Sequence, residues 1–82
     1  MRIVVIEDEE DLRNLVVFNL RAEGHEVLGA AGAGEGMALC VRHAPDVVVL
    51  DRMLPGAEGL DLCEQLRSDS ELADVGVVVL SA

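Results

Sequence analysis

Residues 47–56 read VVVLDRMLPG, so four apolar side chains lead directly into Asp51 and a Pro55-Gly56 pair follows. A short β-branched apolar run is typical of a strand buried on both faces of a parallel sheet. A Pro-Gly pair is a turn signal. The stretch therefore predicts a buried strand that ends on a carboxylate and leaves the sheet through a turn.

Two similar apolar runs, residues 3–6 and 77–80, and a weaker strand-like segment, residues 26–31, occur elsewhere, and helix-like segments separate all four. We predict strands over residues 3–6, 26–31, 46–51 and 76–80, and helices over residues 11–23, 35–43 and 57–68. Strict alternation with short connections favours a three-layer αβα fold, a parallel sheet with helices on both faces. The first helix is expected to turn Leu12, Leu15, Val16 and Leu20 toward the sheet.

The composition argues against several classes of protein for this chain, among them nucleic-acid binders and membrane proteins. The chain has 82 residues, enough for one small domain, and its 16 acidic residues outnumber six basic ones. Such an acidic balance lacks the electrostatic signature of a nucleic-acid or anionic-lipid binder. No apolar run approaches the roughly 18 residues of a membrane span, and no signal peptide precedes the first strand, so we expect a cytoplasmic protein. Cys40 and Cys63 match no zinc pattern and are interpreted as small buried thiols.

Polar residues stand at the carboxyl ends of three of the predicted strands. Glu7 and Asp8 follow the first strand, Asp51 ends the third, and Ser81 follows the fourth. In open α/β sheets ligands bind beyond the carboxyl ends of the strands, where the strand order reverses. If the first and third strands are neighbours, Asp8 and Asp51 converge there, and carboxylates that close repel one another unless a cation neutralises them.

Mg²⁺ is the cation that this chemistry favours, because it takes a few carboxylates, keeps several waters and joins readily to phosphate oxygens. A strand-end aspartate beside such an ion can act as a nucleophile toward phosphorus and form an acyl phosphate. Ser81 could then donate a hydrogen bond to the phosphoryl group.

Two other readings of these motifs are weaker. The glycine-rich stretch over residues 29–36 follows a strand and precedes a helix, but Met37 stands where a dinucleotide loop needs its last glycine. A phosphatase of the aspartyl-nucleophile type places D-x-D on its first strand, with a lysine, whereas residues 51–53 lie on the third and lack the second aspartate.

The whole chain resembles the receiver domain of bacterial two-component response regulators. The pieces that carry the resemblance, in order, are Glu7-Asp8, residues 9–12, residues 20–27 (LRAEGHEV), residues 44–51 (APDVVVLD), residues 53–56 (MLPG), Gly59 and residues 79–82 (VLSA). The MLPG motif is similar to the sequence at this position in the receivers of winged-helix transcription factors. The resemblance implies a flavodoxin-like parallel sheet of order 2-1-3-4.

The resemblance also implies roles for single residues. Asp51 would be the phosphoacceptor, Mg²⁺ would be held by Glu7, Asp8, Asp51 and the backbone carbonyl of Met53, and Ser81 would be the switch hydroxyl. Pro55 and Gly56 would form a structural turn. The implied partners are a histidine kinase and an effector domain or downstream regulator. Direct nucleic-acid contact by this segment and membrane contact are not expected.

Two departures from the family pattern leave an alternative open. The family carries a lysine on a fifth strand, whereas this chain contains no lysine. Residues 1–82 are therefore expected to form a partial receiver domain without the fifth strand and the last two helices. Arg52, beside the site, could supply part of the missing positive charge. The alternative function is a receiver that is not phosphorylated and serves as a binding or oligomerisation scaffold, and an uncovered fourth strand predicts self-association.

Overall fold

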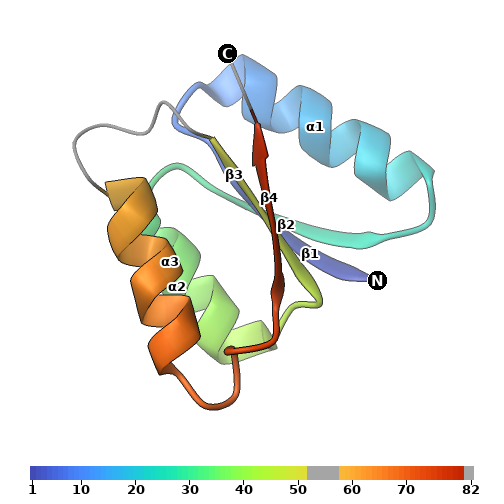
Figure 1. Ribbon diagram of the computed structural model, residues 1–82. Coiled ribbons are helices and arrows are strands. Elements are labelled where there is room, and N and C mark those ends of the chain that lie inside the picture. Colours follow the sequence, from blue (N-terminus) through green and yellow to red (C-terminus); the bar gives the residue numbers. More distant parts are fainter. Residues whose placement is uncertain (52–57, 81–82) are drawn as a thin grey trace.

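The computed structural model describes residues 1–51 and 58–80 and shows an alternating β/α chain (Figure 1). Its elements are β1 (Arg2–Ile6), α1 (Glu10–Ala22), β2 (Glu26–Ala30), α2 (Ala33–His43), β3 (Val47–Asp51), α3 (Glu58–Ser68) and β4 (Gly76–Leu80). The four strands form one parallel sheet of order β2-β1-β3-β4. The predicted alternation, strand order and parallel sheet are therefore confirmed.

The helices lie on both faces of the sheet, as expected for parallel strands that must be covered on each side (Figure 1). Helix α1 covers one face, and α2 and α3 lie together on the other. No helix within residues 1–51 and 58–80 has the length and apolar character needed to cross a bilayer.

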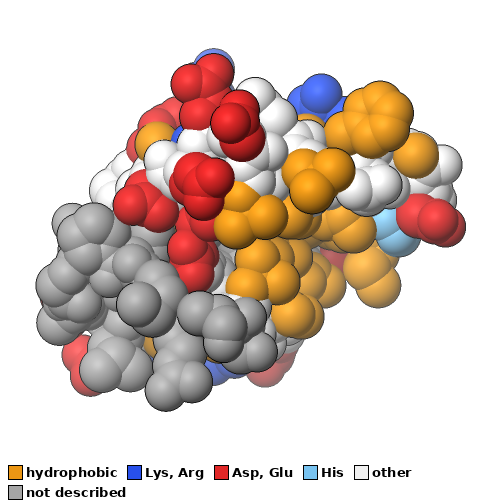
Figure 2. Space-filling model, turned by 90° about the horizontal axis from the view of Figure 1, so that it is seen from above, with side chains coloured by type: hydrophobic (Ala, Val, Ile, Leu, Met, Phe, Trp, Pro, Cys, Tyr) orange, Lys and Arg blue, Asp and Glu red, His pale blue; other side chains and the backbone are white. Residues whose placement is uncertain are grey.

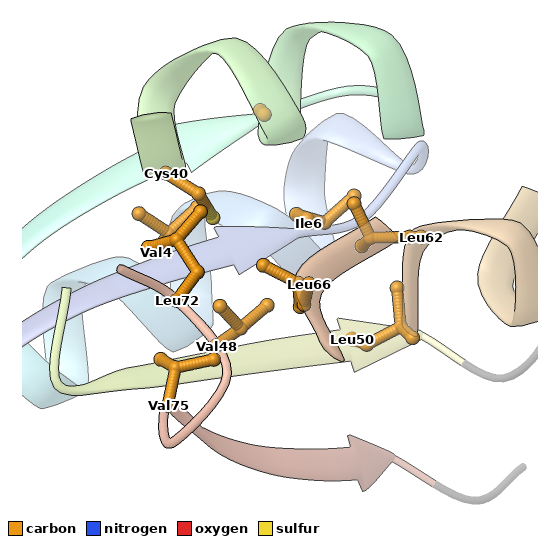
Figure 3. Close-up of a cluster of buried hydrophobic side chains, with 10 residues drawn as sticks. Val4, Ile6, Cys40, Val48, Leu50, Leu62, Leu66, Leu72 and Val75 are labelled. Carbon is orange, nitrogen blue, oxygen red and sulfur yellow. The ribbon is translucent and has the colours of Figure 1, made fainter. Parts of the chain in front are cut away.

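Aliphatic side chains build the main core between the sheet and the α2–α3 layer (Figure 3). Its members include Val4, Ile6, Cys40, Val48, Leu50, Leu62, Leu66, Leu72 and Val75. A smaller cluster of Ile3, Val5, Val27 and Val49 lies under α1. Phe18, the only aromatic residue, is exposed. Of the two thiols predicted to be buried, Cys40 is buried and Cys63 half-buried.

Helix α1 faces the sheet largely as predicted, because Leu12, Val16 and Leu20 are half-buried, but Leu15 differs. Leu15 was expected to point inward, but 57% of it is exposed, whereas Val17 packs against the smaller cluster. The half-buried positions include Arg13, Val16, Val17 and Leu20, a spacing of i, i+3, i+4 and i+7 that marks one helix face. The prediction for Leu15 was wrong because Val17, and not Leu15, lies with Val16 and Leu20 on the face of the helix that meets the sheet.

Helix α2 begins at Ala33, two residues before the predicted start. Its first turn contains Glu35, whose Oε2 accepts a long hydrogen bond of 3.4 Å from the backbone N–H of Ala31. An acidic residue in the first turn also interacts favourably with the helix dipole. Further along, Gly36 is buried where α2 passes close to Ile6 of β1, so a glycine allows the close approach of helix and strand.

Candidate functional site

The register of β1 and β3 brings the predicted acidic residues together. Ile6 pairs with Leu50, so the next residues along the two parallel strands are Glu7 and Asp51. One carboxylate oxygen each from Glu7, Asp8 and Asp51 lies within 4.8 Å of the others. The structure therefore confirms that the first and third strands are neighbours and that these side chains converge at the carboxyl end of the sheet.

Burial differs sharply across the three carboxylates. Only 1% of Glu7 is exposed, Asp51 is half-buried, and Asp8 is exposed. The pKa of Glu7 rises from 4.5 to about 7, mainly because the carboxyl group is buried, and also because of a hydrogen bond with Asp51 and the charges of Asp51 and Asp8. A backbone hydrogen bond from Asp8 acts in the opposite direction. Around neutral pH, Glu7 is therefore protonated in only part of the protein population, and that proton lies in the hydrogen bond with Asp51.

The surroundings of the Glu7 atom Oε2 show whether a cation fits this site. It is buried and has no hydrogen-bond partner among the described residues. A buried carboxylate oxygen without a partner is unfavourable, and a bound cation is one of the few groups that relieve it. Three clustered carboxylates form the hard oxygen donor set that Mg²⁺ prefers. The residues present therefore fit a magnesium ion.

The backbone around Glu7 is held from two sides. Its N–H donates to the carbonyl oxygen of Ala30 at the end of β2, at 3.0 Å. Its carbonyl oxygen accepts a hydrogen bond of 2.9 Å from an Nη of Arg13 in α1. The sequence reasoning missed Arg13. The signal that could have revealed it is its position on the inward stripe of α1, where a charged residue needs a polar partner.

Four residues named from the sequence lie outside the described residues. These are Met53, Pro55, Gly56 and Ser81. Their roles in ligation, turn formation and switching stay predictions. Arg52 lies outside the described residues as well.

Comparisons with known proteins point to one family. A family model for the response regulator receiver domain matches residues 3–82. Over 81 residues the chain is 40% identical to the DNA-binding dual master transcriptional regulator RpaA of Synechocystis; this region covers 99% of the chain and 34% of that protein.

Solved structures agree with the sequence match. The N-terminal domain of a response regulator receiver protein from Methanoculleus marisnigri superposes with a TM-score of 0.90 at 26% identity, covering 99% of this chain and 66% of that one. The non-phosphorylated HemR receiver domain of Leptospira biflexa gives a TM-score of 0.86 at 32% identity, covering 99% and 64%.

The chain therefore belongs to the response regulator receiver domain family, the receiver modules of two-component signalling. It spans about a third of the length of the curated relative and about two thirds of the solved receivers. Its fold is the receiver fold in a shorter form, with four strands and three helices in the described residues.

Proposed function

We propose that this chain is a phosphoacceptor module that takes a phosphoryl group from a histidine kinase onto Asp51. The observation that carries the proposal is the convergence of Glu7, Asp8 and Asp51 at the carboxyl end of β1 and β3. In the transfer, a carboxylate oxygen of Asp51 forms a bond to phosphorus as the bond from phosphorus to the histidine nitrogen breaks. The imidazole leaves with the electron pair of that bond.

Glu7, Asp8 and Asp51, with the Met53 carbonyl, would hold the magnesium ion, Asp8 more directly than Glu7. When bound, the ion neutralises charge on the phosphoryl oxygens and on the carboxylates that approach them. Asp8 is exposed and can meet an incoming ion first. Glu7 is buried, and its shared proton must leave before both it and Asp51 can act as anionic ligands. Ser81 would then donate a hydrogen bond to the phosphoryl group.

Intact mass spectrometry tests the proposal directly. The chain is incubated with Mg²⁺ and a small acyl phosphate donor, alongside Asp51→Asn and Asp61→Asn. Asp61 is an exposed aspartate on α3, so its variant carries the same charge change away from the site. A phosphate-sized gain in the wild type and in Asp61→Asn, but not in Asp51→Asn or in EDTA, supports the proposal. No gain in a wild-type chain shown by circular dichroism to be folded would refute it for this chain.

The output of such a module would be transcriptional. The support is the 40% identity to a protein described as a DNA-binding transcriptional regulator, and this chain spans about a third of that protein. An effector domain, or a separate downstream regulator, would read the phosphorylated state. The kinase and the effector would meet the module in the cytoplasm.

A second candidate function is a scaffold that associates with another copy of itself. Among residues 1–51 and 58–80, β3 is the sole strand paired with β4, whose sequence GVVVL has neither charge nor proline to protect an edge. Val78 is 50% exposed and pairs with Val49, so it shares the face of the sheet that α1 covers, and Leu15 and Phe18 of α1 are also exposed. Figure 2 shows an apolar area on this side of the molecule, next to a group of acidic side chains. Unpaired strand edges are self-complementary, so we propose a second copy as the occupant.

Sedimentation at increasing concentration tests the scaffold function. Val78→Lys should shift the protein toward monomer, because it places a charge on the edge strand. Val41→Lys is the matched control, since Val41 is also exposed but lies on α2, away from β4. A wild type that stays strictly monomeric at high concentration would rule this function out.

A further inference from the structure

We propose that Arg13 is a positioning residue for the magnesium site: it fixes the backbone that carries Asp8. This inference rests on the proposed function, because it gives Arg13 a role at the same site. Arg13 itself is no metal ligand, and it acts through the backbone of its neighbours.

The contacts of Arg13 lie on both sides of Asp8. The side chain donates from Nη to the carbonyl oxygen of Glu7 at 2.9 Å. The backbone N–H of the same residue donates to the carbonyl oxygen of Glu9, also at 2.9 Å. The second bond is the ordinary helical bond from residue 13 to residue 9, so the contact that depends on the arginine side chain is the one to the Glu7 carbonyl, immediately before Asp8. The segment between strand and helix is short, so these two contacts restrict how the Asp8 carboxylate can be presented.

The stem of Arg13 is held in place by β2. A Cβ built at Gly29 would lie 3.4 and 3.5 Å from the Cδ and Cγ of Arg13, so the methylene groups of the arginine pass directly over this glycine. A larger residue at position 29 would press on the stem. The carbonyl oxygen of Ala30, also in β2, accepts a hydrogen bond from the N–H of Glu7. Strand β2 therefore supports both the Arg13 stem and Glu7, the residue to which Arg13 donates.

The charge of Arg13 acts against its positioning role and must be separated from it. A guanidinium near the cluster repels a divalent cation, so loss of this charge alone would strengthen Mg²⁺ binding. Loss of the hydrogen bond to Glu7 would weaken Mg²⁺ binding, because partners that orient a metal site typically contribute about 10-fold or more to affinity. At 0.5 M KCl the Debye length is about 4 Å, so the charge effect is largely screened and the positioning effect remains.

The chain offers a matched control on the same helix. Arg21, in the last turn of α1, donates to the carbonyl oxygen of Val27 at 2.8 Å. Like Arg13, it is an arginine that reaches from α1 to a backbone carbonyl six residues away in sequence. Arg21→Met and Arg13→Met remove the same charge and the same type of bond, but Arg21 is about 12 Å further along the helix. Methionine retains most of the apolar stem in both variants.

The experiment is a Mg²⁺ titration in 0.5 M KCl, followed by backbone amide NMR, for the wild type, Arg13→Met, Arg21→Met and Asp8→Asn. We expect the Kd for Mg²⁺ to rise about 5- to 10-fold in Arg13→Met and less than 2-fold in Arg21→Met. Without metal, the amide signals of Asp8 and Glu9 should shift in Arg13→Met but not in Arg21→Met. The midpoints of thermal unfolding should fall by similar amounts in both.

Each alternative result has a definite meaning. If wild-type binding is lost in Asp8→Asn but Arg13→Met binds Mg²⁺ as the wild type does, the positioning role is wrong and the magnesium site stands. If both arginine variants weaken binding equally, Arg13 acts through general stability, and the positioning role is again wrong. If the wild type shows no binding that depends on Asp8, both the site and the role of Arg13 are refuted.

Discussion

Gly36→Ala should destabilise the protein even though alanine is the better helix former. A Cβ on Gly36 would overlap the Cδ1 of Ile6 and lie 2.7 Å from its Cγ1. Ile6 is fully buried, so it cannot move aside without disturbing the core. Overpacking of this kind costs about 1–3 kcal/mol, and two overlapping atoms place it near 3 kcal/mol. Alanine favours the helix over glycine by about 1 kcal/mol, so the net loss in the free energy of unfolding is about 2 kcal/mol.

Gly34→Ala is the control for this change. Gly34 lies in the first turn of the same helix, is exposed, and has no atom within 4 Å of the place where a Cβ would stand. Here only the propensity term acts, so we expect a gain of up to about 1 kcal/mol. Urea unfolding followed by circular dichroism should thus separate the two variants by up to about 3 kcal/mol. Gly36→Ala alone should lower the Tm by roughly 8–16 °C.

Ile6→Val then tests whether the clash with Ile6 is the cause. Valine lacks Cδ1, so the double variant should lose less stability than the sum of the two single losses. The reasoning is refuted if Gly36→Ala is as stable as Gly34→Ala, or if the two changes at positions 6 and 36 are simply additive. Because Ile6 directly precedes Glu7, the same displacement should also weaken Mg²⁺ binding.

Three further predictions concern single side chains. Folding raises the pKa of Glu7 from 4.5 to about 7, so without metal the folded state keeps a proton that the unfolded state loses, and stability falls as pH rises from about 5 through 7. The free energy of unfolding should fall by about 1–3 kcal/mol over this pH range, allowing for screening by water at the exposed rim. Glu7→Gln should abolish this pH dependence, as urea titrations at several pH values would show. Arg67 donates to two carbonyls of the α3–β4 connection at 2.7 and 2.9 Å, so Arg67→Met should cost about 1–2 kcal/mol in the same assay; an unchanged midpoint would contradict this. Burial raises the pKa of Cys40 to about 11, so a thiol reagent at pH 8 should modify half-buried Cys63 at least about 10-fold faster, as peptide mapping would show.

The sequence alone predicted the fold because its signals agree. Three β-branched runs and the weaker segment over residues 26–31 alternate with amphipathic segments, and short connections between them permit few arrangements other than a parallel sheet. The meeting of Asp8 and Asp51 follows from the same logic, because parallel strands bring their carboxyl ends to one edge. The position of the site, at the carboxyl ends of the first and third strands, therefore follows from the sequence.

Other features depend on distances that a sequence does not contain. Residues 15–18 of α1 read LVVF, four apolar residues in a row, so periodicity alone cannot decide which of them faces the sheet. The packing of Val17 and the Arg13 stem over Gly29 decides it, and Leu15 and Phe18 are left exposed. Likewise, a side chain that donates to a backbone carbonyl six residues earlier belongs to no sequence motif, and the position of Arg13 on the inward stripe of α1 is a signal only once that stripe is known.

The burial of Glu7 couples the protonation of the site to the binding of an ion. A carboxyl group that is 1% exposed, beside a second carboxylate, is unfavourable as an anion, so in the metal-free protein its pKa rises to about 7 and most molecules carry the proton at pH 6.5. A divalent cation reverses this preference, and its binding must then release a proton. The fold thus holds a site whose charge state is poised to change on ion binding. Under the proposed function, Mg²⁺ would prepare Asp51 for transfer by removing the proton it shares with Glu7. Calorimetric Mg²⁺ titrations at pH 6.5 in two buffers of different ionisation enthalpy should differ in apparent enthalpy, and equal enthalpies would show that no proton leaves.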